Sequence, residues 1–577
     1  MARRKVIVKH FILNILVLIA SMVAYAHEAP SFESWWPAQR APKKLVTCIP
    51  ADANDLREMN LAQSMAGLAA LGINEKTTDE AVWIQIANPN YKIYYQSLVK
   101  RLEVKENGSF KTWALLKRLV SRKTVRGYIL YDCSRNDNSV NLATIHASLQ
   151  HAVLIDLQQE QQAIAMGLAK LADMSHANFD GLAFTSVRDQ LNPNLLVLSN
   201  PAISNNRDYA IAQRAVVYYG VDSLLEKILA WTRPLSPVIG WNKGDEFKHI
   251  EPCTRWGLIN TVSDFCFNLP VLSVPDNKQP SRVRSVDPAK IDWKNTGSFH
   301  SFVMSDGDNM QWTTNQFISS KEYWANSANS NLHMSFTSCL LNLSMASRDV
   351  YEQLIKAQPA DVSFVEYGGG YYYPDLFAKS RPDRWNLVTA YAVRVNKAMK
   401  ATGVKVFGMI CKNLAGEDAQ KVYSIFAKEL EDITGMIAVQ YAPYNGGDGK
   451  IYWLKNNKGI DIPVVTARYQ LWANAKRKNS GNPSELAKWI NADTTTAQLD
   501  WTIVHAWSKF ERSGTDEITD VKKGEKEGER GVGPVKWTAE LIGPNRNMVS
   551  IEELLWRIRM KHDGAATMAL IKKQGDK

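Results

Sequence analysis

The second half of the chain constrains the fold most, because short apolar runs alternate there with helical patterns. Eight candidate strands lie after residue 297, in SFHSFVMS, LHMSFTSCL, DVSFVEY, VKVFGMICK, GMIAVQYA, IPVVTARYQ, WTIVHAW and NMVSI. Eight strand–helix units in roughly 290 residues predict a (β/α)8 barrel of the TIM type. An open parallel sheet, or a barrel that lacks one strand, fits the same alternation and remains an alternative.

Local signals place several helices in this half. The spacing of apolar residues predicts one buried helix face, formed by Trp385, Val388, Ala392, Val395 and Met399. Asn482 before Pro483 predicts a capped helix start with proline at the first helical position. Ser550 followed by Glu553 predicts a capping box that opens the last helix.

The chain has 577 residues, which is too long for one ordinary domain. Residues 27–285 mix helices and strands without one repeating unit, which predicts an N-terminal α/β region that can be divided into two or three subdomains. Segment 273–290 is rich in proline and charge and is typical of a linker. The barrel-like domain is therefore expected at 286–577.

Residues 1–26 have the pattern of a secretory signal peptide. A basic start at Arg3, Arg4 and Lys5 precedes the apolar core FILNILVLIA, and Ala24–Ala26 forms a small-x-small cleavage site. An uncleaved membrane anchor is the alternative reading. No later run of eighteen apolar residues occurs, so we expect an exported, soluble protein in the periplasm or outside the cell, without a stable membrane anchor.

Charge and cysteine content exclude some function classes. The formal net charge of +11 falls to +7 without the four basic residues of the signal segment, and the excess is not clustered. This distribution argues against nucleic-acid binding. The six cysteines include no CxxC, and only Cys253 and Cys266 are close enough in sequence to favour a disulfide. The oligomeric state is not fixed by the sequence.

Polar and aromatic residues follow the predicted strands, where a barrel places its active site. Acids, amides and aromatic rings are the groups that hold a polyhydroxylated ring, so they predict a carbohydrate-binding cleft. The candidates are Asp306, Asp308, Asn309, Gln311, Trp312, Glu366, Gly370, Tyr371, Tyr373, Asn413, Tyr441, Arg468, His505 and Trp507.

The segment GGGYYYP, residues 368–374, joins three glycines to three tyrosines and a proline. Glycine permits unusual backbone angles and close approach, so the run predicts a shaped aromatic platform. This segment, together with SDGDNMQW at 305–312, resembles the motifs of the GxGYxYP family of glycoside hydrolases. The resemblance covers nearly the whole mature chain. It implies an N-terminal α/β region before a barrel-like domain, and cleavage of a polysaccharide or oligosaccharide.

Glycosidic cleavage uses two carboxyl groups, one that protonates the leaving oxygen and one that is a nucleophile or activates water. We assign Asp308 as nucleophile or base, Glu366 as acid and Asp306 as an orienting group. A simple turn is the structural alternative for the DGDN stretch, and a Ca²⁺ loop is a weaker one. No cofactor is expected.

Two other functions fit the same strand ends. A non-catalytic carbohydrate-binding protein needs only the aromatic and amide groups. A metal-dependent deacetylase or esterase needs paired histidines, which the sequence does not offer at metal-binding spacing. The N-terminal half also carries Trp35–Trp36, as a docking segment or a sugar contact, and the acids Asp245 and Glu246.

Overall fold

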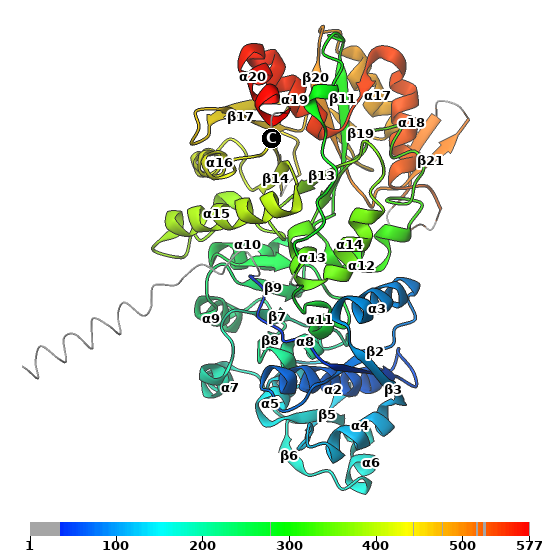
Figure 1. Cartoon of the computed structure of the whole chain (residues 1–577), viewed down its shortest axis with the longest axis vertical. Helices are drawn as coiled ribbons and strands as arrows, with labels where there is room; N and C mark the ends of the chain where they lie inside the picture. The colour runs from blue at the N-terminus through cyan, green and yellow to red at the C-terminus, as the bar shows by residue number, and fades with distance from the viewer. Residues whose placement is uncertain are drawn as a thin grey trace, which may run out of the picture.

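The computed structural model describes residues 35–276, 278–441, 444–475, 477–514, 517–522, 525 and 527–575. The predicted signal peptide, residues 1–26, lies outside the described residues. The molecule is elongated, with the N-terminal region at one end and a large curled sheet at the other (Figure 1). No helix in the described part of the chain is both long and apolar enough to cross a bilayer.

The N-terminal region consists of small parallel sheets flanked by helices, in line with the predicted α/β character. The first sheet has the order β2-β1-β3 and the second the order β5-β4-β6. Their elements are β1 (Lys44–Ile49), α2 (Leu56–Asn74), β2 (Glu80–Ile84), α3 (Pro89–Leu102), β3 (Lys105–Lys111), α4 (Thr112–Ser121), β4 (Gly127–Tyr131), α5 (Ser139–Gln150), β5 (Ala152–Asp156), α6 (Glu160–Ala165), β6 (Lys170–Asp173) and α7 (Gly181–Val187).

A third parallel sheet follows and packs beside the large sheet (Figure 1). Its order is β10-β9-β7-β8, so the strand order reverses between β7 and β9. In open α/β sheets, ligands bind outside the carboxyl ends of strands at such a reversal. The elements are β7 (Leu196–Leu198), α8 (Arg207–Ala212), β8 (Val216–Tyr218), α9 (Ser223–Trp231), β9 (Pro237–Gly240), α10 (Phe247–Arg255), β10 (Ile259–Thr261) and α11 (Leu269–Leu272).

The large sheet has the order β16-β17-β15-β14-β13-β12-β11-β20-β18-β19, with β23 paired to β11. Its strands are β11 (Phe299–Met304), β12 (Ser335–Ser338), β13 (Ser363–Glu366), β14 (Val406–Cys411), β15 (Gly435–Gln440), β16 (Ile451–Lys455), β17 (Asp461–Thr466), β18 (Tyr469–Leu471), β19 (Ser480–Gly481), β20 (Leu499–Val504) and β23 (Asn547–Met548). A separate hairpin contains β21 (Phe510–Ser513) and β22 (Glu517–Asp520). The helices are α12 (Met310–Asn315), α13 (Leu340–Ala346), α14 (Arg348–Lys356), α15 (Arg384–Thr402), α16 (Glu417–Glu429), α17 (Pro483–Ala492), α18 (Val532–Ile542), α19 (Ile551–His562) and α20 (Gly564–Gly575).

The sheet curls so strongly that one bent segment, which contains β17 and β18, pairs with strands near both ends of the strand order. β17 pairs with β15, and β18, two residues further along, pairs with β20. Between them the backbone N–H of Ala467 donates to Ala438 of β15 at 3.3 Å, and that of Arg468 donates to Trp501 of β20 at 3.1 Å. The carboxyl ends of the parallel strands therefore lie together at one end of the curled sheet.

All eight predicted strands form, but they do not make the predicted eight-stranded ring. The eighth, β23, pairs only with the first two residues of β11, and β20 pairs directly along β11. The antiparallel strand β16 is a further element that the alternating pattern did not predict. The structure thus confirms a mixed α/β fold with a large, curled and mostly parallel sheet, and it does not confirm a full (β/α)8 barrel.

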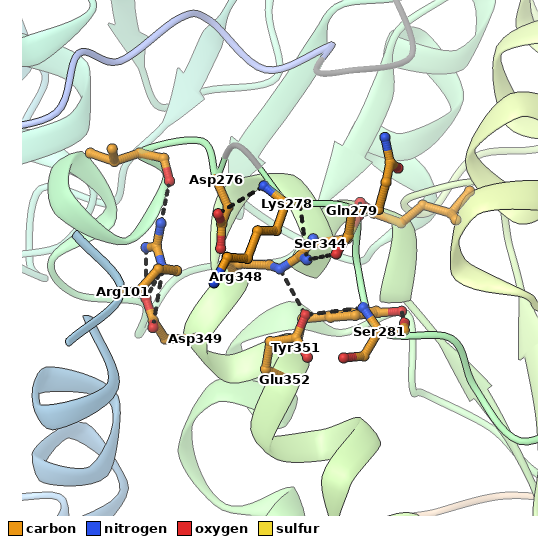
Figure 2. A network of polar contacts seen from close by, with 12 residues as sticks. Arg101, Asp276, Lys278, Gln279, Ser281, Ser344, Arg348, Asp349, Tyr351 and Glu352 are labelled. Carbon is orange, nitrogen blue, oxygen red and sulfur yellow. Dashed lines mark hydrogen bonds and ion pairs between the residues drawn. The ribbon is translucent and has the colours of Figure 1, made fainter. Parts of the chain in front are cut away.

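The predicted linker, residues 273–290, is held by side chains from both halves of the molecule (Figure 2). Arg101 of α3 pairs with Asp349 of α14 at 2.7 Å, and both side chains are largely buried. Arg348 of α14 donates to the carbonyl oxygen of Gln279 in the linker at 2.6 Å. These contacts fix the N-terminal region against the large sheet.

Local signals were accurate at several positions. Helix α17 begins at Pro483 with a complete capping box between Asn482 and Glu485, and the Ser550 hydroxyl caps α19. The proposed disulfide is not formed, because Cys253 and Cys266 are both free and buried.

Candidate functional site

The carboxyl end of β11 places two aspartates in a tight turn. Gly307 between them packs so closely on β12 that a Cβ atom would lie 1.5 Å from the carbonyl oxygen of Thr337. The Gly307 N–H also donates to the Thr337 hydroxyl at 2.8 Å. Asp306 has a φ of 66°, a left-handed conformation that is uncommon outside glycine. The turn therefore fixes both carboxyl groups relative to the sheet.

Asp306 and Asp308 differ in burial. Asp308 is only 7% exposed, and its pKa is raised to about 7 by burial and then by the negative charges of Asp306 and Glu246. Asp306 is partly exposed, and its Oδ2 accepts a hydrogen bond from the Ser305 hydroxyl. Asp306 is therefore the aspartate with surface to offer to a ligand, whereas Asp308 is buried and has a raised pKa.

A third carboxyl group, Glu246, comes from the N-terminal region. It follows β9 and lies at the start of α10. The Tyr371 hydroxyl donates to Glu246 Oε1 at 2.8 Å, and the Tyr441 hydroxyl is a second hydrogen-bond partner. Burial raises the pKa of Glu246, and the negative charge of Asp306 adds to the rise. The site is therefore built from the carboxyl ends of two sheets.

Sequence analysis noted Glu246 but did not place it in the site. The strand-end argument was applied only to the second half of the chain, whereas Glu246 follows a strand of the third sheet. The usable signal is the short apolar run PVIG directly before GWNKGDEF, which is a strand followed by acids.

Glu366 takes a different place from the one we expected. It is 0% exposed, and its oxygens accept hydrogen bonds from the backbone N–H groups of Leu341 at 3.1 Å and Gly369 at 2.7 Å. Burial raises its pKa to about 8. A carboxyl group enclosed in this way holds the backbone of the motif and has no surface to offer to a substrate in this conformation.

Two of the three glycines, Gly369 and Gly370, serve the contact between the two halves. Tyr371 and Asn260 of β10 exchange backbone hydrogen bonds at 2.7 and 3.1 Å. A Cβ atom on Gly370 would lie 2.3 Å from the carbonyl oxygen of Asn260, and one on Gly369 would lie 2.7 Å from the Trp35 ring. The motif is thus a close backbone junction that positions Tyr371, and with it Glu246.

Trp35 and Trp36 dock onto this junction. Both indole N–H groups donate to Asn342 Oδ1, at 3.2 and 3.1 Å. The amide nitrogen of Asn342 donates to Thr261 of β10 at 2.7 Å and to the carbonyl oxygen of Gly369. Of the two readings of the tryptophan pair, the structure favours docking over sugar contact.

Aromatic rings form a continuous wall from the motif to β20. Successive ring centroids are separated by 5.7 Å between Tyr371 and Tyr373, 6.5 Å from there to Tyr441, 6.2 Å to Tyr444, 4.4 Å to Trp472 and 3.7 Å to His505. Tyr373 is 0% exposed and supports the wall from behind, whereas the rings from Tyr441 onward are partly exposed. Trp472 is a member that sequence analysis missed, because it follows the unpredicted break between β17 and β18.

The residues after the aspartate turn act mainly within the fold. Asn309 caps α12 by accepting from the Trp312 N–H at 3.1 Å. Gln311 accepts from the Phe265 N–H at 3.2 Å and so joins the third sheet to the large one. Trp312 is buried against Trp507, with ring centroids 4.8 Å apart.

Two other predicted residues lie apart from the carboxyl cluster. Asn413 is exposed, and its backbone N–H donates to Asp375 at 2.8 Å. Arg468 pairs with Asp493 and donates to Gln498 at 3.2 Å, beside the amino end of β20. Arg468 therefore lies at the amino end of the parallel strands, whereas Asp306 lies at their carboxyl end. Within the described residues, no group of three His, Cys, Asp or Glu side chains is arranged to hold a metal ion.

Comparison with known proteins identifies the class of protein that this fold and site represent. A family model described as "GxGYxYP putative glycoside hydrolase C-terminal domain" matches residues 298–513, and one described as "GxGYxYP third domain" matches residues 193–274. The chain belongs to the GxGYxYP family. The two strands that precede these carboxyl groups, β9 and β11, lie within the matched residues.

One solved structure has the same fold. It is a crystal structure of a "putative hydrolase" from Bacteroides thetaiotaomicron VPI-5482, with a TM-score of 0.74 and 16% sequence identity over 92% of this chain and 98% of that chain. No curated protein matches the chain.

Proposed function

We propose that the protein is a glycoside hydrolase whose carboxyl pair consists of Asp306 from the large sheet and Glu246 from the third sheet. The observation that carries the proposal is the position of Glu246. It is held by the hydroxyls of Tyr371 and Tyr441, which follow β13 and β15, whereas Asp306 follows β11. The two carboxyl groups therefore come from different sheets and meet at one site.

The electrostatic interaction between the two groups fits this chemistry. The negative charge of Asp306 raises the pKa of Glu246, so the two carboxyl groups are near each other although they come from different sheets. Glycosidases separate their two carboxyl groups by about 5–10 Å, depending on whether a water molecule stands between the sugar and the base. Asp306 and Asp308 lie on one turn and so occupy one side of the site.

Differences in exposure and in pKa suggest the role of each carboxyl group. Glu246, with a raised pKa and a partly exposed carboxyl, is assigned as the proton donor to the leaving oxygen. Asp306, the more exposed aspartate, is assigned as the nucleophile or base. Asp308 is assigned as a positioning residue beneath Asp306. Glu246 thus replaces Glu366 as the acid, and the two aspartates exchange the roles first expected for them.

The aromatic wall supports a carbohydrate substrate. The partly exposed rings of Tyr441, Tyr444, Trp472 and His505 lie beside the carboxyl cluster and offer apolar faces to the C–H surface of a sugar. The same wall also favours the second candidate, a non-catalytic carbohydrate-binding protein, because it needs no carboxyl pair. The two functions differ in whether removal of one carboxyl abolishes turnover or leaves only binding to measure.

The test is reducing-end release from a broad panel of plant and host glycans. The wild type is compared with Asp306→Asn and Glu246→Gln, and with Asp245→Asn as a control at an exposed neighbouring acid. We expect release by the wild type and the control, and loss in the other two variants. Equal release by all four proteins would contradict the proposed pair. Binding of a glycan without release of reducing ends by any of them would favour the non-catalytic function.

We also propose that the protein is exported. The basis is the charged, apolar and small-residue pattern of residues 1–26. Amino-terminal sequencing of the protein recovered from the periplasm or the medium should begin after Ala26. Recovery of the full chain in the cytoplasm would contradict export.

A further inference from the structure

Trp489 differs from every other tryptophan of the chain. The sequence has 18 tryptophans, all of them among the described residues, and Trp489 alone is classed as exposed, with 41% of its surface accessible. It lies on α17, whose buried face is formed by other residues such as Leu486 and Ile490. Tryptophan is enriched among the residues that dominate binding surfaces, so an exposed ring that also borders a groove is a candidate contact for a ligand.

The ring borders a groove of about 810 Å³ on the surface of the large-sheet half. The groove is lined by residues of the segment after β18, by the exposed side of α17 and by β22, including Arg477, Lys478, Ser480, Lys488, Trp489 and Asp520. The same segment carries Trp472, which belongs to the aromatic wall. Arg477 donates from Nη1 to the carbonyl oxygen of Tyr444, another ring of that wall. The groove therefore adjoins the candidate active site.

The groove carries three basic side chains, Arg477, Lys478 and Lys488, and two acidic ones, Glu485 and Asp520. Its two carboxylates already accept backbone hydrogen bonds, Glu485 from the Asn482 N–H at 3.0 Å and Asp520 from the Asn474 N–H at 2.8 Å. Lys478 and Lys488 are exposed and form no ion pair within the described part of the chain. An aromatic face in a groove that also carries two exposed ammonium groups suits a ring that has an apolar side and a carboxylate substituent.

We infer that this groove is an accessory binding site for an acidic polysaccharide, in which a uronic acid ring stacks on Trp489 and its carboxylate pairs with Lys478 and Lys488. The inference rests on the proposed function only for the class of polymer, which would run from this groove into the cleft along the segment between Trp472 and Arg477. The site would hold the polysaccharide during repeated cleavage and would not take part in the chemistry.

Binding of a short oligogalacturonide is measured by calorimetry beside its methyl-esterified form, which keeps the sugar rings and removes the charge. All proteins carry Asp306→Asn, so that no turnover occurs and the result does not depend on hydrolysis. The test variants are Trp489→Ala and the pair Lys478→Gln/Lys488→Gln. The controls are Leu182→Ala, at an 82% exposed apolar residue, and Lys397→Gln/Lys428→Gln, at two exposed lysines on α15 and α16.

We expect Trp489→Ala to weaken binding of the acidic probe at least about tenfold, as truncation of a central aromatic contact does. The lysine pair should weaken it about threefold to tenfold, in a salt-dependent way, and should leave the weak binding of the ester unchanged. The controls should bind as the parent does. Equal binding of the two probes by the parent would overturn the inference that the ligand is an acidic polysaccharide. Binding by Trp489→Ala that equals the parent would overturn the site itself, whether or not the protein hydrolyses any glycan.

Discussion

Two strand ends of the large sheet carry acidic residues, and they use them in opposite ways. At the end of β11, Asp306 is partly exposed and acts electrostatically on Asp308 and on Glu246 of another sheet. At the end of β13, Glu366 is enclosed and receives two backbone N–H groups. The same residue type at the same edge thus serves the site in one case and the backbone in the other.

The difference lies in what surrounds each carboxyl. The β13 end continues into glycines that let the chain approach β10 closely, and Glu366 satisfies backbone groups that this approach buries. The β11 end meets other carboxyl groups at the site. The glycine-tyrosine motif is therefore best understood as the joint that brings Glu246 to the site.

The largest expected effect separates the two proposed catalytic roles. Glu246→Gln should slow cleavage of a natural glycan about 10²–10⁴-fold, because general-acid assistance is lost. An aryl glycoside with a good leaving group needs no such assistance and should be cleaved much faster by this variant than the natural glycan is. Asp306→Asn should be slow on both substrates and should regain activity with added azide. Azide rescue of Glu246→Gln alone would reverse the two assignments.

The joint itself can be tested by Gly370→Ala. The new Cβ would collide with the carbonyl oxygen of Asn260, whose strand cannot withdraw without losing its pairing with Tyr371. We expect a loss of about 1–3 kcal/mol in the free energy of unfolding, measured in urea. Gly564→Ala is the control, because the nearest atom to its Cβ would be 3.5 Å away. Equal stability of the two variants would contradict the close junction.

The enclosure of Glu366 predicts a pH dependence of stability. Its folded pKa of about 8 lies above the ordinary 4.5, so the folded state binds more protons between these values and stability falls as the pH rises through them. Glu366→Gln removes this titration. In urea unfolding, the decline between about pH 5 and about pH 9 should be smaller for this variant than for the wild type or for the exposed control Glu511→Gln. Parallel curves for all three proteins would show that Glu366 is not enclosed.

The smallest expected effect concerns Tyr441. Its hydroxyl lowers the pKa of Glu246 by bonding to the charged form, against the larger effect of burial. Tyr441→Phe should therefore raise that pKa further and move the basic limb of the pH–rate profile upward by up to about one unit. Tyr444→Phe removes a hydroxyl from the next ring of the wall and should leave the limb in place. A downward shift in Tyr441→Phe would contradict the role of Glu246 as the acid.

Much of the fold could be predicted from the sequence, because it depends on local patterns. Every predicted strand of the second half formed, and Asn482 and Ser550 begin helices as their capping patterns indicate. The closure of the ring was not predicted correctly. The pattern does not show that the two residues between β17 and β18 form a bend. It also does not show that β23 pairs with only two residues of β11.

The candidate site was predictable only in part, because its members come from two sheets. Asp306, Asp308, Tyr441 and His505 follow from the strand-end rule. Glu246 reaches the site through packing of the third sheet on the large one, which no local pattern encodes. The enclosure of Glu366 was not predicted for a related reason. The burial of a strand end depends on which other segment covers it.

The most direct test of the account compares Glu246→Gln with Glu366→Gln, the same chemical change at the open and the enclosed carboxyl. Turnover of an active glycan and the thermal midpoint are measured for both. The account predicts that Glu246→Gln keeps the wild-type midpoint and loses turnover at least about a hundredfold. It predicts that Glu366→Gln loses stability and keeps turnover in proportion to the folded fraction. Loss of turnover in a fully folded Glu366→Gln, with Glu246→Gln as active as the wild type, would contradict it.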